Sequence, residues 1–547
     1  MSVDATTGTS PGVPAQAEHP RALEPLTLVV LAILSVLGAM IGLHMITTLG
    51  ISPNTSVIGA LVAMLVGRVA FMGLVRFRSI HRQNLAQTAI SSATFGAANS
   101  LITPIAIPWA TGRTDLVWPM LCGALMGLAI DVWVLYRSYG SSFLPAHGAW
   151  PSGVAAAETI KAGDSGGKQA ALLGAGGVAG FALNFFGLPM SAAGVALIGN
   201  MWALLMFGIG LLINQYYPNF SDGGVTLSSQ YIPHGVMIGA GLVALVQAGF
   251  LLAGRSSSAK GAPAPQALDE NDPSLAPTVT VEALRRTFSI GYGLYVAGAI
   301  VLATATGIWG DMSVPAMIGW VLFAAFAAIV HELIVGLAAM HSGWFPAFAV
   351  TLIFLIFGLL LHIPTEPLIV LVGYCAATGP AFADMGYDFK AGWLLRREHR
   401  PYTAFELEGR RQQLLGGVIG FVVAAAMVAL LWRSYFEAGD VPPVSTVYAT
   451  SIVDGLTKPH MITTLALWAI PGALIQLIGG PKRQMGVLLA TGLLVSSPNA
   501  GWLVLAALAV RVVWERTRGD QGENEMALVG AGLIAGDSIY SAGQILK

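Results

Sequence analysis

The side chains in this sequence that could do chemistry are the few ionisable and amide groups that interrupt its long apolar runs. A polar group among apolar residues is costly to bury, so it usually faces a partner or a solvated cavity. These residues are Gln87, Asn99, Asp131, Glu158, Asn184, Asn200, Glu332, Asp384, Asp388, Lys390 and Asp537. For an asparagine or glutamine, a structural hydrogen bond between helices is the alternative. A carboxylate without a nearby cation favours a functional role.

The stretch "HGAWPSGVAAAETI" (147–160) is an unusual way to continue an apolar segment. Pro151 has no backbone N–H and suits the first turn of a helix. Ser152 and Gly153 would leave backbone groups near that helix start free to meet an anion. We therefore expect a discontinuous helix that lines a cavity, with a buried Glu158 one to two turns behind its tip. The alternative is a surface loop with Glu158 in solvent.

A second unusual stretch, "GPAFADMGYDFKAGWLL" (379–395), places Asp384 and Asp388 one helical turn apart and Lys390 close to both in sequence. These three groups could form a neutralised cluster, a proton relay or a cation site. The alternative is a group at the membrane surface whose side chains reach the water. We expect the three charges to act as a unit, because charges this close in an apolar interior hold one another.

The motifs of known enzymes are incomplete in this chain. The run "HELIVG" (331–336) begins like a zinc-protease helix, but Val335 stands where the second histidine is required. Ile534 replaces the leading glycine of the Gly-x-Gly-Asp motif of intramembrane aspartyl proteases. Cys122 and Cys375 lie in apolar runs and are expected to be small, buried, inert residues. We expect no enzymatic activity, no cofactor and no resident metal, and an intramembrane protease remains a minor alternative.

The elements that position these groups belong to a chain that is mostly apolar. Of its 547 residues, 55% are hydrophobic and 10% are charged, against about 25% charged residues in soluble domains. Apolar runs recur along the chain, and about 20 residues are needed to cross a bilayer as a helix. The composition predicts an all-α polytopic membrane protein. The formal net charge of −1 argues against a nucleic-acid partner.

The apolar segments fall into two sets. Eight lie within 24–254 and nine within 285–547; the polar stretch 255–284 between them is predicted to be a cytoplasmic linker, and residues 1–23 a disordered cytoplasmic tail. We expect roughly 16 transmembrane or re-entrant helices in two repeat-like halves, with broken helices at the centre. Segment 485–514 carries "SSPN" in its middle and is expected to form a hairpin of two short helices.

Two further patterns concern orientation and symmetry. Basic residues crowd three connecting segments, 76–82, 255–286 and 396–411. The positive-inside rule places these segments, and with them the N-terminus, in the cytoplasm. The runs "IGAGLVA" (238–244) and "VGAGLIA" (529–535) lie 291 residues apart and indicate an internal repeat.

Four stretches together resemble the oligopeptide transporter superfamily. They are "NLAQTAISSATFGAANSLITPIAI" (84–107), "WPSGVAAAETI" (150–160), "ADMGYDFKAGWLL" (383–395) and "GAGLIAGDSIYS" (530–541). They follow the family's order and span nearly the whole chain. The sequence departs from the family pattern at Trp150, Val154, Trp393 and Ser538, where the family has Tyr, Thr, Tyr and Gly.

This resemblance implies proton-coupled import through about sixteen helices built by duplication. The family includes oligopeptide transporters and the Yellow Stripe-like carriers of metal chelates, and the C-terminal motif leans toward the latter branch. We expect a secondary active transporter in the cell membrane, inner or plasma, with a small peptide or a siderophore- or nicotianamine-like metal chelate, protons and the lipid bilayer as partners. A facilitator or exporter of another small amphipathic metabolite is the alternative. A monomer and a homo-oligomer both stay open.

Under this hypothesis the candidate residues take three roles. The expected substrate pathway consists of Gln87, Asn99, Trp150, Pro151, Ser152, Gly153, Asn184 and Asn200. Proton coupling is expected first at Glu158, with Glu332 and Asp537 as the other candidates. The charge cluster consists of Asp384, Asp388 and Lys390.

Overall fold

The fold is built from helices and the turns between them. The computed structural model describes residues 18–49, 55–68, 73–165, 167–221, 225–252, 272–343, 346–455, 461–495, 497 and 499–543. Within these ranges the β-type pairing is a single bridge between Tyr139 and Leu144. Most of the predicted tail 1–23 and most of the predicted linker 255–284 lie outside the described residues.

The helices of the first half extend to residue 252. They are α1 (Pro25–His44), α2 (Thr55–Arg68), α3 (Ile80–Phe95), the π-helical η3 (Gly96–Ile102), α4 (Thr103–Ala110), α5 (Val117–Ser138), α6 (Pro151–Ser165), α7 (Gly167–Phe185), α8 (Met190–Ile198), α9 (Met201–Tyr216) and α10 (Ile232–Leu252). Those of the second half are α11 (Val281–Thr306), α12 (Val314–Ser342), α13 (Ala347–Leu360), α14 (Thr365–Ala376), α15 (Pro380–Arg396), α16 (Tyr402–Glu437), α17 (Pro443–Asp454), α18 (Met461–Arg483), α19 (Met485–Leu494) and α20 (Ala500–Gly543).

Eight helical stretches in the described part of the chain are long and apolar enough to cross a membrane. They are Pro25–Thr47, Ile80–Ala110, Thr114–Ser138, Val281–Thr306, Val314–His341, Thr365–Arg396, Tyr402–Glu437 and Thr463–Gly480. Shorter apolar helices include Ala171–Phe185, which packs on α20, and Met485–Leu494, which packs on α9, α10 and α18. The predicted all-α polytopic architecture is confirmed.

Several of the apolar segments in the described part of the chain are broken or short. Segment 365–385 is split between α14 and α15 at Gly379, whose φ of +86° suits a residue without a side chain. Segment 485–514 forms α19 and the first part of α20, which is the predicted pair of helices. The predicted segment 144–161 overlaps α6, which has 15 residues. Such a helix rises only about 22 Å, short of the ~30 Å hydrocarbon core.

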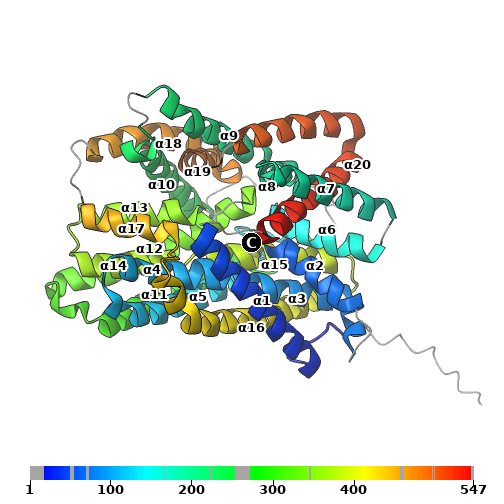
Figure 1. The fold of residues 1–547 in the computed structure, drawn as a ribbon, viewed down its shortest axis with the longest axis horizontal. Coiled ribbons are helices and arrows are strands. Elements are labelled where there is room, and N and C mark those ends of the chain that lie inside the picture. The colour runs from blue at the N-terminus through cyan, green and yellow to red at the C-terminus, as the bar shows by residue number, and fades with distance from the viewer. Residues whose placement is uncertain are drawn as a thin grey trace, which may run out of the picture.

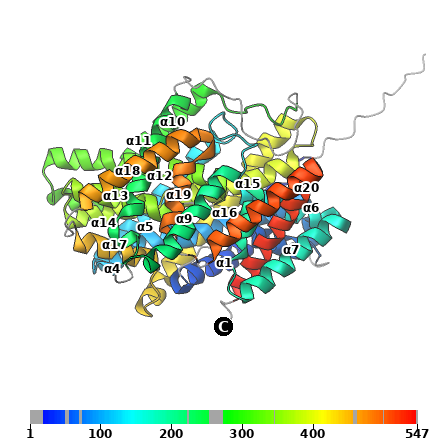
Figure 2. The same ribbon diagram turned by 90° about the horizontal axis from the view of Figure 1, so that it is seen from above.

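Seven helices of the first half fall on helices of the second half at the offset of 291 residues that the glycine runs indicate. Adding this offset moves α1, α2, α5, α6, α7 and α8 onto α12, α13, α16, α17, α18 and α19, and moves α10 onto the part of α20 after Gly519. The packing repeats as well: α10 packs on α18, and the end of α20 packs on α7. Figures 1 and 2 show these two pairs on opposite sides of the molecule. Each half therefore lends its last helix to the other half.

Glycines bring α7 and α20 into close contact. A Cβ atom at Gly532 would lie 2.8 Å from the Gly176 Cα atom, and one at Gly180 would meet the backbone of Leu533. Backbones approach this closely only where both helices carry small residues, as in many membrane proteins. The pairing of α7 with α20 therefore depends on these glycines.

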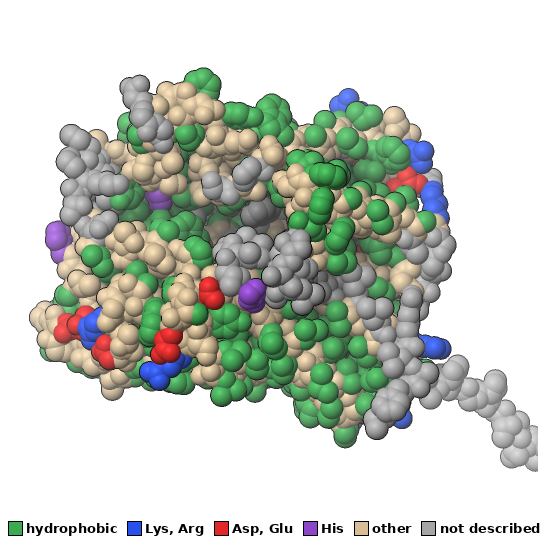
Figure 3. Space-filling view, viewed as in Figure 1, with side chains coloured by type: hydrophobic (Ala, Val, Ile, Leu, Met, Phe, Trp, Pro, Cys, Tyr) green, Lys and Arg blue, Asp and Glu red, His purple; other side chains and the backbone are tan. Residues whose placement is uncertain are grey.

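The outer surface is apolar over wide areas. Side chains such as Ile33 on α1, Leu430 on α16 and Ile478 on α18 are 65%, 74% and 76% exposed. In Figure 3 hydrophobic side chains spread over the visible face, and charged side chains are confined to a few groups. Exposed apolar patches of this extent are rare on soluble monomers and suit contact with lipid. Cys122 lies on the exposed surface, contrary to the expected burial, whereas Cys375 is buried as expected.

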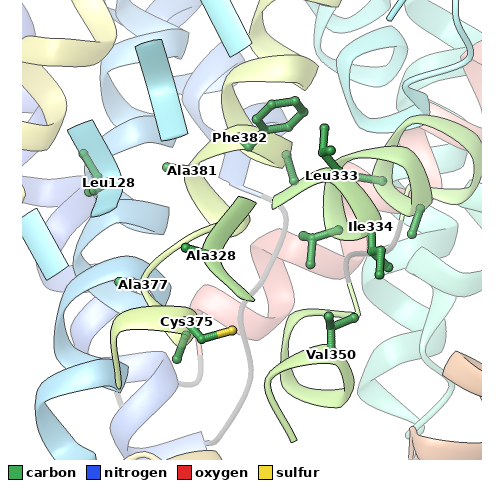
Figure 4. Packing of buried hydrophobic residues seen from close by; sticks show 14 of the residues in the cluster. Leu128, Ala328, Leu333, Ile334, Val350, Cys375, Ala377, Ala381 and Phe382 are labelled. Atoms are coloured by element: carbon green, nitrogen blue, oxygen red, sulfur yellow. The ribbon is translucent and has the colours of Figure 1, made fainter. Parts of the chain in front are cut away.

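Helix α15 lies at the centre of the molecule (Figure 1) and is buried along almost its whole length. It packs against α3, α5, α6, α12 and α16. Figure 4 shows apolar side chains, among them Leu128 and Ala328, around its N-terminal end near Phe382. With 17 residues, it rises about 25 Å. Polar groups on α15 are therefore presented to the interior over much of the depth of a membrane.

Candidate functional site

A buried carboxylate caps the N-terminal end of α15. Pro380 occupies the first helical position, where its missing N–H costs nothing. The Asp131 Oδ1 atom of α5 accepts a hydrogen bond of 3.0 Å from the Gly379 N–H group, and Oδ2 accepts one of 2.8 Å from the Phe382 N–H group. A negative charge is favoured at a helix N-terminus. Asp131 thus fixes the start of α15.

Glu332 of α12 lies beside Asp131. Its Oε2 atom accepts a hydrogen bond of 2.5 Å from the Tyr295 hydroxyl, and its Oε1 atom has no hydrogen-bond partner among the described residues. The side chain is fully buried. Two buried carboxylates that face each other repel. Of the three residues predicted for proton coupling, Glu332 is the one that the structure buries beside a second carboxyl group.

Asp384 and Asp388 lie one turn apart in the middle of α15, facing α3. The Ser91 hydroxyl donates a hydrogen bond of 2.5 Å to Asp384 Oδ1, and the Gln87 amide donates one to Asp388 Oδ1. Ser91 also contacts the Ser56 hydroxyl of α2 at 2.9 Å. Both carboxyl groups are fully buried, and within the described structure the Oδ2 atom of each has no hydrogen-bond partner. Each of the two carboxyl groups therefore has a side-chain hydrogen-bond partner for only one of its two oxygen atoms.

Lys390 does not join this pair, which corrects the predicted cluster of three charges. Its ammonium group donates to the Ala146 carbonyl at 3.2 Å and lies 4.3 Å from the centre of the Trp393 ring. Among the described residues no ion pair joins it to Asp384 or Asp388. A residue two positions beyond Asp388 is turned by about 200° around the helix. Lys390 therefore lies on the opposite face of α15 from Asp388, although the two residues are close in sequence.

The start of α6 packs against the same stretch of α15. Pro151 begins the helix as predicted, and Trp150 before it has a φ of +40° and donates its N–H to the Met340 carbonyl at 2.8 Å. A Cβ atom at Gly153 would meet the Tyr387 carbonyl and the Lys390 side chain. Gly153 is therefore required for helix packing here, whereas the sequence suggested a backbone open to a substrate.

Aromatic and hydroxyl groups gather where α6 meets α15. The Trp150 ring lies 5.8 Å from the Tyr387 ring and 6.4 Å from the Tyr139 ring, measured between centroids. The Trp150 Nε1 and Tyr139 hydroxyl atoms are buried without a hydrogen-bond partner among the described residues. The hydroxyls of Ser152 and Tyr387 are neighbours without a well-formed hydrogen bond. An unsatisfied buried donor costs about 1–3 kcal/mol, so each such group calls for a specific explanation.

The C-terminal end of α15 carries a buried ion-pair network. Arg396 donates its Nε–H to Glu406 Oε2 at 2.8 Å, and Arg410 donates to Glu406 Oε1 at 3.0 Å. Arg410 also donates to the Tyr139 carbonyl at 2.9 Å. The network joins α15, α16 and the chain that follows α5. The sequence placed Arg396 and Arg410 in a solvated basic loop, but both are buried.

The remaining predicted residues lie apart from α15 or have other roles. Asn200 caps α9 by accepting the Trp202 and Ala203 N–H groups at 3.1 Å each. Asp537 caps α8 by accepting the Met190 N–H group at 2.8 Å and the Ser191 hydroxyl at 2.5 Å. These contacts fix helix ends.

Asn184, Glu158 and Asn99 complete the predicted set. Asn184 donates to the Asp537 carbonyl at 3.3 Å. Glu158 pairs with Lys161 at 3.2 Å and is 20% exposed, so it is not the buried acid that the sequence suggested. Asn99 is half-buried in the π-helical η3 segment, and such segments are common at functional sites.

Sequence reasoning missed several residues of this interior. Tyr139, Tyr295 and Tyr387 carry no signal, because single tyrosines in apolar runs are common. Within the ranges that the structure covers, no group of three or more His, Cys, Asp or Glu side chains is arranged to hold a metal ion.

The sequence of the chain matches a known protein family over most of its length. The model of the family described as OPT oligopeptide transporter protein matches residues 179–544, roughly two-thirds of the 547 residues. The matched range includes α15, α16 and the C-terminal run that resembles this family. No curated protein matches the chain.

Proposed function

The chain belongs to the OPT oligopeptide transporter family, and we propose that it is a secondary active transporter that imports a small peptide or a metal chelate together with protons. The observation that carries the proposal is the line of incompletely satisfied polar groups on and around α15. It runs from Glu332 through Asp384 and Asp388 to the Trp150 and Tyr139 donors. Residues at membrane depth that keep such groups usually line a substrate or ion pathway.

We assign substrate recognition to the place where α6 meets α15. The unsatisfied atoms there include the Trp150 indole N–H and the Tyr139 hydroxyl, which can donate hydrogen bonds. Peptides and metal chelates are rich in carbonyl and carboxylate oxygens, which accept such bonds. The aromatic rings supply apolar contact to the rest of an amphipathic ligand. In the compact arrangement described above, the site is closed around these groups.

We assign proton coupling to Asp384 and Asp388, with Glu332 as the next candidate. Two carboxylates one turn apart in an apolar interior repel each other. A proton relieves that repulsion, and so does a cationic group of the substrate. Glu158 and Asp537 are less suited, because an ion pair satisfies Glu158 and two hydrogen bonds satisfy Asp537.

We place the end of the molecule that carries Arg397, Arg400 and Arg411 in the cytoplasm, by the positive-inside rule. The Arg396–Glu406–Arg410 network then closes the cytoplasmic side of α15. Import requires this network to open after the substrate has bound.

Reconstituted vesicles test this function. Wild-type protein should accumulate labelled peptide or chelate when the outside is acidic, and a protonophore should abolish the accumulation. Asp388→Asn mimics the protonated group, so it should keep substrate exchange but lose uphill accumulation. Glu158→Gln is the matched control and should behave like wild type. Loss of coupling in Glu158→Gln alone, with Asp388→Asn unchanged, would overturn the assignment.

The second candidate function is a facilitator or exporter of another amphipathic metabolite. The same aromatic site would suit it, and the carboxyl pair would then be structural. A facilitator brings substrate only to equal concentrations on both sides, whatever the proton gradient. The vesicle experiment therefore separates the two candidates.

A further inference from the structure

We propose that Asn84, Gln87 and Gln413 form a hydrogen-bond relay through which the charge state of Asp388 controls the Arg396–Glu406–Arg410 network. The proposal rests on the proposed function, because it assigns the coupling step to a defined set of contacts. It makes the three amide residues positioning residues, which act through Asp388 and Arg396.

One branch of the relay runs through the side chains of α3. Arg396 Nη1 donates to Asn84 Oδ1 at 3.5 Å, which is the loosest contact of the branch. Asn84 Nδ2 then donates to Gln87 Oε1 at 3.0 Å, and Gln87 Nε2 donates to Asp388 Oδ1. Asn84 is 1% exposed and the other three side chains are fully buried. Water therefore does not compete for these contacts.

A second branch runs through α16 and reaches the same residue. Arg396 Nη1 donates to Gln413 Oε1 at 2.8 Å, and Gln413 Nε2 donates to the Asp388 main-chain carbonyl at 2.7 Å. Both branches begin at one nitrogen atom of Arg396; the first ends on the Asp388 carboxylate, whereas the second ends on the Asp388 main-chain carbonyl and serves to hold that residue in place. Two independent routes between the same two residues make the connection a feature of the packing of α3, α15 and α16 together.

The chemistry of the two ends fixes the direction of every bond between them. A guanidinium group can only donate hydrogen bonds, and an ionised carboxylate can only accept them. Each amide must therefore turn its oxygen toward Arg396 and its NH₂ group toward Asp388. Amide dipoles aligned in this way polarise one another and strengthen the chain while both ends are charged.

The charge of Asp388 at one end of the relay compensates the charge of the ion-pair network at the other end. The network at the end of α15 holds two arginines and one glutamate, so it carries one surplus positive charge. Arg396 Nη2 and Asp388 Oδ2 are both buried without a partner among the described residues. A buried charge is stable only when it is compensated. An ionised Asp388 provides that compensation through the relay, and a neutral Asp388 does not.

Other titratable groups surround α15. Those on the elements packed against it and on α15 itself include His81, Arg82, Asp131, Arg137, Glu158, Lys161, His331, Glu332, Asp384, Tyr387, Lys390, Arg396, Tyr402, Glu406 and Arg410. Of the described charged groups, Asp384 is the one that interacts directly with Asp388. Ser56, Gln87 and Gln413, which approach Asp388 from α2, α3 and α16, are uncharged. Arg396 therefore reaches Asp388 through amides alone.

The consequence is a link between proton binding and opening of the end of α15 that carries the ion-pair network. Arg396 holds α15 to α16 through Glu406, and Arg410 holds α16 to the Tyr139 carbonyl and the Thr278 hydroxyl. When Asp388 becomes neutral, the relay weakens and the surplus charge loses its compensation. The contacts of Arg396 and Arg410 with Glu406 should then be the first to break at the C-terminal end of α15.

Hydrogen–deuterium exchange of the full-length protein in micelles tests the relay without any substrate. The readout is the protection of residues 397–410, measured at several pH values and corrected with unfolded protein. In the wild type this protection should fall as the pH is lowered. Gln87→Met keeps the size of the side chain but removes the donor to Asp388. The midpoint of the fall should therefore move upward by about one to two pH units.

Matched controls and a double substitution complete the test. Gln83→Met makes the same chemical change on the same helix, α3, but outside the relay. It should keep the wild-type midpoint, because Gln83 contacts the Arg78 carbonyl instead. Gln413→Met breaks a contact to the Asp388 main-chain carbonyl and leaves the donor to the carboxylate in place, so it should shift the midpoint less than Gln87→Met does. Its neighbour Gln412→Met should not shift it. Asp388→Asn should remove the pH dependence, and Gln87→Met should add nothing in that background.

Three results would overturn the relay. They are a pH-independent wild type, an unchanged midpoint in Gln87→Met, and a Gln87→Met effect that persists without Asp388. Failure of the proposed function would show itself separately, as an absence of proton-driven accumulation in vesicles.

Discussion

Glu406 holds the end of α15 together, and replacing it by glutamine tests the reasoning about buried charge. Its two oxygen atoms accept hydrogen bonds from Arg396 and Arg410. The side chains of Arg396 and Glu406 are 0% exposed. Removing one partner from a buried ion pair costs about 3–5 kcal/mol, because the remaining charge stays buried without compensation. Here two arginines would remain.

The magnitude follows from the size of the protein. At about 2 °C per kcal/mol, the value for large domains, a loss of 3–5 kcal/mol lowers Tm by roughly 6–10 °C. The assay is thermal unfolding of purified protein in detergent, followed by the fraction that stays monodisperse. Glu408→Gln is the matched control: Glu408 is 41% exposed and pairs with Arg411 at 3.7 Å. Exposed pairs of this kind contribute at most about 1 kcal/mol.

A double substitution sharpens the test. Arg410→Met removes one of the two cations, so Glu406→Gln with Arg410→Met should lose less stability than the sum of the two single changes. Equal Tm values for Glu406→Gln and Glu408→Gln would refute the reasoning. So would a double variant as unstable as the sum.

Three further predictions concern other parts of the fold. Gly532→Leu should prevent α20 from packing on α7 and abolish the monodisperse peak in size-exclusion chromatography, whereas Gly174→Leu, which has open space around it, should not. Asn200→Ala removes the cap of α9 and should cost about 1 kcal/mol, read as a small fall in Tm. The hydrogen bond from Arg82 lowers the pKa of Glu24 below its usual 4.5. The stabilisation by the ionised Glu24 is therefore present above pH 4.5 and is lost as the pH falls through the folded-state pKa. The Tm difference between wild type and Glu24→Gln should shrink in acid.

The fold was largely predictable because apolar length and glycine runs are local properties of the chain. The offset between "IGAGLVA" and "VGAGLIA" matches the observed helix order, and "SSPN" marks the break between α19 and α20. The breaks were harder to predict. The kink between α14 and α15 depends on Gly379, one glycine among 66.

The candidate site was predictable only in part, because it is made by contacts between distant segments. Sequence spacing brought Asp384 and Asp388 together correctly, but it could not show that Gln87 bonds to Asp388 from 301 residues away. Lys390 was misplaced because closeness in sequence was taken for closeness in space. A helical period of 3.6 residues puts it on the far side of α15.

The basic segment 396–411 shows a second limit of reading charge from sequence. An arginine-rich stretch after an apolar run predicts a solvated loop, and Arg400 and Arg411 are exposed as that pattern predicts. Arg396 and Arg410 are buried, because Glu406 lies between them and satisfies both. The pattern of charge did not distinguish the arginines that face water from those that hold helices together.

The central claim is that substrate import and proton influx are one process. The most direct test is a pH-sensitive dye sealed inside vesicles that contain the purified protein, with no proton gradient imposed. Adding the transported peptide or chelate outside should acidify the interior, at a rate that saturates with substrate and is lost in Asp388→Asn. Substrate that enters without any change of internal pH would contradict the account.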